Sequence, residues 1–177
     1  MAALVYLDNS NLWIEGKRLG AVYRGTSPDI ATAYETRDFD NTFRLDFGKV
    51  LEIANNKPIK VAKFYGSRPP ESDTVWNMAK KVGFEPVIVD RNYSNKEKGV
   101  DTQLVVDMME DAGSADPNKD IFILIAGDAD YIPAIRKIKS KNFRVQVLFW
   151  NHASSIELKN ETTFKSLDGY FNEVRVK

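Results

Sequence analysis

Short apolar runs alternate along this sequence with segments whose apolar residues recur every three or four positions. Runs of strand length fall at residues 4–7, 60–65, 84–89, 121–126 and 143–149. Helical spacing of apolar residues predicts helices over residues 12–19, 47–54, 75–82, 100–112, 132–138 and 154–160. Strands that alternate with helices are typical of βαβ units, in which helices cover both faces of a parallel sheet. The pattern therefore predicts an α/β fold.

Two segments stand out from this alternation. Residues 121–126 are apolar throughout, which is typical of a central parallel strand. Residues 20–42 contain two glycines, a proline and scattered polar residues, and we interpret them as a long loop or insertion. The length of 177 residues matches one domain, and no internal repeat stands out. We therefore expect a single domain over residues 1–177.

The composition limits the chemistry that this chain can perform. The 25 basic and 25 acidic residues give zero net charge, which argues against binding nucleic acid through a bulk positive surface. With no cysteine and one histidine, the chain has no disulfides, no thiol nucleophile and no paired-histidine catalysis. Carboxylates, amides, hydroxyls and oxygen-preferring metals remain. No segment has the length of a membrane span or the features of a signal peptide, so we expect a cytoplasmic protein.

Four aspartates occupy positions where α/β sheets bind ligands. Asp8 follows the first predicted strand, Asp128 and Asp130 follow the fourth, and Asp101 opens the helix between the third and fourth. Ligands of parallel sheets bind beyond the carboxyl ends of the strands, so these aspartates converge if the first and fourth strands are neighbours. Clustered carboxylates repel one another and recruit a counter-ion. Mg²⁺ or Mn²⁺ is the natural one, because it prefers oxygen ligands.

Ordinary structural roles are the alternative for these aspartates. Asp8, Asp101 and Asp130 could each cap a helix N-terminus, although Ser10 and Asn11 could also cap the first helix. Three caps at one edge of one sheet with no shared purpose would be a coincidence. Asp107 lies six residues after Asp101 on the same predicted helix, about 120° away around its axis, and we expect it to face water.

The zero net charge conceals a segregated distribution. Residues 101–130 carry eight acidic residues and one basic residue, whereas residues 131–150 carry five basic residues and no acidic one. This pattern predicts a metal site beside a basic wall that holds phosphates. A metal there would lower the pKa of a bound water and stabilise the negative charge that develops on a phosphodiester.

Three motifs occur in order on these elements. They are Tyr6-Leu7-Asp8-Asn9-Ser10-Asn11, Lys98-Gly99-Val100-Asp101 and Ala126-Gly127-Asp128-Ala129-Asp130-Tyr131-Ile132-Pro133. Together they resemble the motifs of NYN domains in the PIN-like nuclease superfamily, in particular the LabA-like (DUF88) group. The resemblance covers roughly residues 4–149. Ala126 departs from the usual Ser or Thr, and Asn142 stands where glycine commonly ends a helix, a position that Asn tolerates.

The resemblance implies a Rossmann-like three-layer α/β/α sandwich with a central, mainly parallel sheet of five or six strands. It also implies metal-dependent ribonuclease activity with Mg²⁺ or Mn²⁺. By motif position, the acidic site would consist of Asp8, Asp101, Asp128 and Asp130. Asn11 would hold a phosphate or a metal-bound water, and Lys98 would contact the nucleic-acid backbone.

Other residues are candidates for substrate contacts. Four basic residues follow the second and third strands: Arg68, Arg91, Lys96 and Lys98. They form either a phosphate-binding rim or ordinary charged loop residues that face solvent. Trp13 and Tyr93 could stack on unpaired bases, although packing is the more common role of aromatic residues. His152 could donate a proton, although a lone histidine is more often structural.

We predict a metal-dependent nuclease that acts on RNA, with single-stranded RNA favoured, and leave self-association into a homo-oligomer open. The alternative is a catalytically silent RNA- or protein-binding module with the same fold. A phosphatase of the haloacid dehalogenase type would use Asp8 as its nucleophile. It ranks low, because that chemistry needs a second aspartate where this chain has Ser10.

Overall fold

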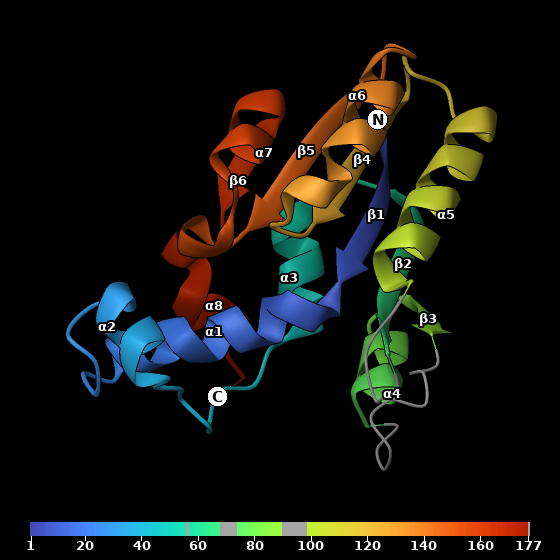
Figure 1. Ribbon diagram of the computed structural model, residues 1–177. Helices are drawn as coiled ribbons and strands as arrows, with labels where there is room; N and C mark the ends of the chain where they lie inside the picture. The colour runs from blue at the N-terminus through green and yellow to red at the C-terminus, as the bar shows by residue number, and fades with distance from the viewer. Residues whose placement is uncertain (56, 68–73, 90–98, 177) are drawn as a thin grey trace.

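A single parallel sheet forms the centre of the molecule in the computed structural model, which describes residues 1–55, 57–67, 74–89 and 99–176 (Figure 1). The strand order is β3-β2-β1-β4-β5-β6, and every neighbouring pair is parallel. The strands are β1 (Ala2–Asp8), β2 (Ile59–Ser67), β3 (Glu85–Val89), β4 (Asp120–Ile125), β5 (Arg144–Phe149) and β6 (Thr163–Ser166). The strand order reverses between β1 and β4, which is where parallel α/β sheets bind ligands.

Helices cover both faces of the sheet. They are α1 (Asn9–Tyr23), α2 (Ile30–Thr36), α3 (Phe47–Ala54), α4 (Thr74–Lys81), α5 (Val100–Ser114), α6 (Ile132–Lys139), α7 (Ile156–Glu161) and α8 (Phe171–Val174). Three 3₁₀ turns each lie between a strand and the helix that follows it: η1 (Ala129–Tyr131), η2 (Asn151–Ala153) and η3 (Asp168–Tyr170). This arrangement confirms the predicted three-layer α/β/α sandwich.

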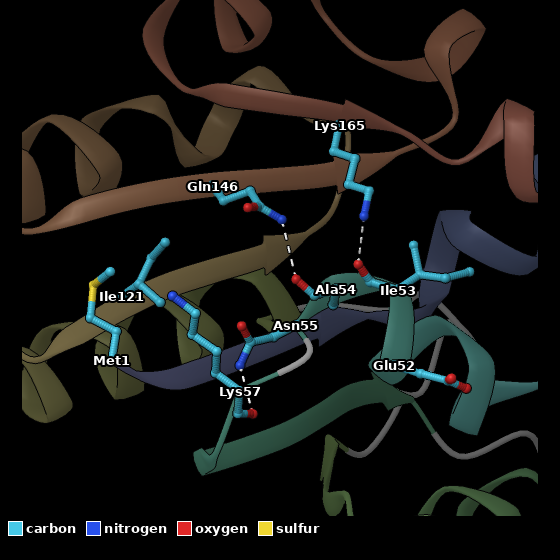
Figure 2. A pocket seen from close by; sticks show the side chains of 9 residues that line it. All are labelled: Met1, Glu52, Ile53, Ala54, Asn55, Lys57, Ile121, Gln146 and Lys165. Carbon is cyan, nitrogen blue, oxygen red and sulfur yellow. Dashed lines mark hydrogen bonds between the residues drawn. The ribbon is translucent and has the colours of Figure 1, made fainter.

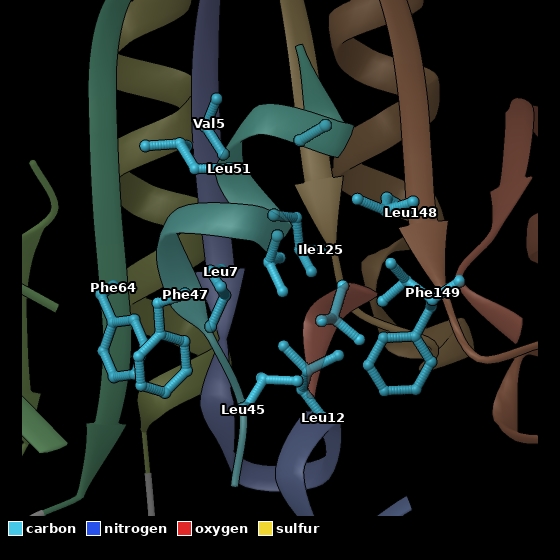
Figure 3. Packing of buried hydrophobic residues seen from close by; sticks show 14 of the residues in the cluster. Val5, Leu7, Leu12, Leu45, Phe47, Leu51, Phe64, Ile125, Leu148 and Phe149 are labelled. Carbon is cyan, nitrogen blue, oxygen red and sulfur yellow. The ribbon is translucent and has the colours of Figure 1, made fainter. Parts of the chain in front are cut away.

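Side chains of β1 alternate between two hydrophobic cores, because successive residues of a strand point to opposite faces. Val5 and Leu7 pack with Phe47 and Leu51 of α3 on one face, as Figure 3 shows. On the other face, buried residues of β1 and β4 pack against α5 and α6. The strands between them are buried on both faces, which explains why they are continuous apolar runs in the sequence.

The prediction of an irregular segment over residues 20–42 was wrong. Helix α1 continues to Tyr23, and α2 follows within the segment, capped by Asp29, whose carboxylate accepts from the Thr32 amide at 2.8 Å. Gly20 does not end α1. A Cβ there would lie 2.7 Å from the Asp40 Cβ, so this glycine lets the following chain pack closely against the helix.

Other boundaries lie close to their predicted positions. The five predicted strands and six predicted helices are all present, and β6 adds a sixth strand within the C-terminal segment. Asn142 has a φ of 66° and Gly83 a φ of 102°, so both take the left-handed conformation expected after a helix. Within the described part of the chain, no helix is long and apolar enough to cross a membrane.

Candidate functional site

An acidic cavity of about 240 Å³ opens at the carboxyl edge of the sheet, where the strand order reverses. Three parts of the chain line it: the β1–α1 junction, the start of α5, and the turn between β4 and α6. The described lining residues are Asp8, Ser10, Asn11, Asp101, Asp128, Asp130 and Tyr131. The structure therefore brings the four predicted aspartates and Asn11 to one cavity.

Asp8 is the most constrained of these carboxylates. It is only 8 % exposed, and it caps α1, since its Oδ1 accepts from the Ser10 amide at 2.9 Å. The Tyr131 hydroxyl donates to Oδ2 at 2.8 Å. Thus Asp8 is indeed a helix cap, in place of Ser10 or Asn11. Capping uses one oxygen and orients the whole carboxylate toward the cavity, so the structural role and a ligand role are compatible.

Tyr131 is buried beneath the cavity. Burial raises its pKa, and the charge of Asp8, the hydrogen bond to Asp8 and the charges of Asp101 and Asp128 raise it further. The phenol therefore stays protonated at neutral pH and remains a hydrogen-bond donor. Its hydrogen bond fixes the position of the Asp8 carboxylate.

The other three aspartates are exposed and less constrained. Asp128 caps η1, because its Oδ1 accepts from the Asp130 amide at 2.9 Å, so the predicted cap at Asp130 was wrong by two residues. Asp101 is also no cap, since Gly99 occupies the N-cap position of α5 with a φ of 90°. Asp101 lies in the first turn of α5, where the helix dipole favours a negative charge.

The donor atoms of this cavity suit a hard divalent cation, because carboxylates, an amide and hydroxyls all offer oxygen. Across the described ranges, however, no three Asp, Glu or His side chains lie close enough together to hold one ion. Mg²⁺ commonly keeps several waters and binds proteins through one or two carboxylates. The residues present therefore fit a hydrated ion better than a closed protein cage.

Asp107 contradicts the prediction that it faces water. It is 9 % exposed, and its carboxylate accepts from the Tyr65 hydroxyl at 2.7 Å and from the Gln103 amide at 2.8 Å. Lys63 of β2 lies 3.6 Å from Asp107 and 3.1 Å from Asp111, and Tyr6 of β1 also donates to Asp111 at 2.7 Å. Asp107 and Asp111 follow Leu104 by three and seven residues, which is the spacing of a buried helix face.

The predicted basic wall is not beside the acidic cavity. Arg136 pairs with Glu157 and Glu161 of α7, at 3.1 and 2.6 Å, and Arg144 begins β5 at the opposite edge of the sheet. None of the five basic residues of 131–150 is among the described residues that line the cavity. The acidic residues of 101–130 are also spread out. Asp120, for example, pairs with Lys60 at 3.0 Å, at the amino edge of the sheet.

Several predicted substrate contacts lie outside the described residues: Arg68, Arg91, Tyr93, Lys96 and Lys98. Trp13 is 39 % exposed and does not line the acidic cavity. His152 does not line it either, and its Nε2 lies 3.1 Å from Glu15 Oε2. This pairing favours the structural role of His152 over proton donation.

A cavity of about 370 Å³ lies at the opposite edge of the sheet (Figure 2). Gln146 donates to the Ala54 carbonyl at 3.3 Å, and Lys165 donates to the Ile53 carbonyl at 2.8 Å. These two side chains satisfy carbonyls at the last turn of α3, which the helix itself leaves without partners. The Gln146 and Lys165 side chains that Figure 2 shows here therefore serve helix capping.

Comparison with known proteins gives a family and a fold. The family model of the NYN domain matches residues 27–168. This match begins after Asp8 and Asn11, so the placement of those two residues at the site depends on the geometry described above. A crystal structure of a protein of unknown function from Vibrio parahaemolyticus has a TM-score of 0.67 at 18 % identity, over 99 % of this chain and 96 % of that one. No curated protein sequence matches the chain.

Proposed function

The chain belongs to the NYN domain family, a PIN-like domain, and from this premise we propose that it is a metal-dependent nuclease that hydrolyses the phosphodiester bonds of RNA. One observation carries the proposal: four aspartates from three separate parts of the chain line a single cavity where the strand order reverses. Parallel α/β sheets bind their ligands at that position. Membership of the LabA-like group and a cytoplasmic location stay predictions.

We assign Mg²⁺ or Mn²⁺ to Asp8, Asp101, Asp128 and Asp130, which would hold it directly or through water. Such an ion lowers the pKa of a bound water and offsets the charge that builds on a phosphodiester. The chain's own contribution is orientation. Tyr131 and the Ser10 amide fix the Asp8 carboxylate. Asn11 is exposed and lines the cavity, and we propose that its amide donates to a phosphate oxygen.

A catalytically silent RNA- or protein-binding module is the second candidate. The observation in its favour is that, within the part of the chain that the structure describes, no three carboxylates form a ready metal-binding group. Against it stands the convergence of four aspartates on one cavity, because carboxylates that share a site repel one another unless a counter-ion binds there. Titration calorimetry with Mn²⁺ separates the two, because a silent module binds no ion at this cavity.

The decisive experiment compares the wild type with Asp8→Asn and Asp128→Asn on labelled single-stranded RNA, with Mg²⁺ and with EDTA. Asn caps helices as well as Asp does, so both changes remove a charge and keep the helix cap. Asp116→Asn is the matched control, since Asp116 lies in the turn before β4 and pairs with Lys119 at 3.3 Å. We expect cleavage to fall at least about 100-fold in the two site variants, the size of effect seen when a key electrostatic group is removed. Equal cleavage by all four proteins, or none by the wild type on any RNA, refutes the nuclease.

A further inference from the structure

A second cavity adjoins the acidic cavity and shares Asn11 and Asp128 with it. Its volume is about 390 Å³, and its other walls come from α1, α2 and the carboxyl ends of β4 and β5. Glu15 and Tyr34 form one side of it. A nucleic-acid strand with a phosphate beside Asp128 therefore has its neighbouring nucleotide within reach of the second cavity.

Tyr34 presents a fixed aromatic surface at this cavity. Its side chain is 42 % exposed, although three contacts hold it in place. The Arg18 guanidinium lies 3.8 Å from the ring centroid, the hydroxyl donates to Glu15 at 2.5 Å, and His152 packs edge-on at 6.2 Å between centroids. An exposed aromatic ring that is already ordered can stack on an unpaired base at little entropic cost.

Glu15 supplies a directional acceptor in the same cavity. Its side chain is 13 % exposed, and Arg18, Tyr34 and His152 all direct their polar atoms to Oε2, at 3.2, 2.5 and 3.1 Å. Among the described residues, none donates to Oε1. Burial alone would raise the pKa of Glu15, but the hydrogen bonds with His152 and Tyr34 and the charge of Arg18 lower it overall. Oε1 is therefore an ionised acceptor that suits an N–H group.

We propose that the second cavity is a nucleobase subsite, in which an unpaired base stacks on Tyr34 and donates an amino hydrogen to Glu15 Oε1. The subsite rests on the proposed function, because its nucleotide adjoins the phosphate at the acidic cavity. A base is available to it only when unpaired, so the substrate class is single-stranded nucleic acid. Cytosine fits better than uracil, because cytosine presents an amino group where uracil presents a carbonyl that the carboxylate repels.

The test measures binding of fluorescent hexamers of cytidylate and of uridylate by anisotropy, in EDTA and in Mg²⁺, and cleavage separately in Mg²⁺. We expect wild type to bind the cytidylate roughly ten-fold more tightly. Glu15→Gln should bring the ratio of the two dissociation constants close to one. A loss of folded protein affects both hexamers equally, so it does not change this ratio. Tyr34→Ala should weaken binding of both hexamers roughly ten-fold, the usual effect of losing a stacking ring.

Tyr23→Ala is the matched control, because Tyr23 is an exposed tyrosine at the end of α1 and lines neither cavity. It should leave both dissociation constants unchanged. Tyr34→Phe keeps the ring and should bind almost as the wild type does, which separates stacking from a loss of folding. The subsite is overturned if Tyr34→Ala binds both hexamers as the wild type does and Glu15→Gln keeps the wild-type ratio, even where cleavage proceeds. It is also overturned if the wild type binds neither hexamer. A ratio that depends on Glu15 without any cleavage supports the subsite and refutes the nuclease.

Discussion

Replacing Gly127 by alanine tests how tightly the turn after β4 is packed. An added Cβ would lie 2.5 and 2.7 Å from Cδ1 and Cε1 of Phe149 and would also overlap the carbonyl oxygen of Ala153. The ring could rotate, but the carbonyl belongs to the backbone between β5 and α7. That segment is held to the turn by the Ser155 amide, which donates to the Gly127 carbonyl at 3.1 Å.

The expected magnitude follows from this geometry. Gly127 does not have a positive φ, so the substitution causes no backbone strain and its whole cost is steric. Overpacking of a buried site costs about 1–3 kcal/mol, and contact with backbone places Gly127→Ala near the upper figure of about 3 kcal/mol. In a chain of this length, each kcal/mol lowers Tm by about 2–4 °C, so the loss should be about 6–12 °C.

Thermal unfolding followed by circular dichroism measures this loss, and Gly113→Ala is the control. Gly113 lies near the end of α5, and a Cβ there would have no heavy atom within 4 Å beyond its chain neighbours and the nearby backbone of its own helix. Alanine is favoured over glycine in a helix by about 0.5–1 kcal/mol, so this variant should keep or slightly raise Tm. If Gly127→Ala melts within about 2 °C of the wild type, the close approach of the turn to Ala153 is refuted.

Two further predictions concern buried aspartates outside the acidic cavity. Asp107→Ala leaves the buried Tyr65 hydroxyl without its acceptor and should cost about 2 kcal/mol, measured by urea unfolding. The double variant with Tyr65→Phe should recover part of this loss, and no recovery would contradict the assigned hydrogen bond. Burial would raise the pKa of Asp40, but hydrogen bonds from Thr42 and Arg24 lower it to about 2. The ionised Asp40 therefore stabilises the folded state fully above its ordinary pKa of 3.8, and this stabilisation is lost as the pH falls toward 2. Asp40→Asn should therefore lose less stability than the wild type between pH 4 and pH 2, and equal losses would refute the assignment.

The sequence was most informative where local pattern and strand topology agree. The aspartates after β1 and β4 could be placed at one edge because a parallel sheet brings the carboxyl ends of its strands together. The prediction that Asp107 faces water was wrong because it used only the angle around the helix axis between Asp107 and Asp101. Its donor at Tyr65 lies on another strand, which helical periodicity does not reveal. The three-residue spacing between Leu104 and Asp107 indicates that both lie on the same buried helix face, and this spacing would have corrected the prediction.

The second cavity could not be predicted for a related reason. Tyr34 lies on α2, within a segment whose glycines indicated a loop. Gly20 is in fact part of α1 and allows close packing against Asp40, and only the folded chain distinguishes these two uses of glycine. Glu15 and His152 are 137 residues apart, and no motif connects them. Contacts of this kind depend on tertiary packing and leave no periodic trace in the sequence.

The central strand also has a consequence for how the protein is made. β1 pairs with β4 in a register that sets Ala2 opposite Asp120, 118 residues later in the chain. At about 5–20 residues per second, a ribosome needs roughly 6–24 s to synthesise that interval. Asp8 therefore emerges long before the strand that brings Asp128 to it. If the protein cleaves RNA, its active centre is incomplete throughout this interval, so the nascent chain cannot attack the message from which it is being translated until β4 has left the ribosome.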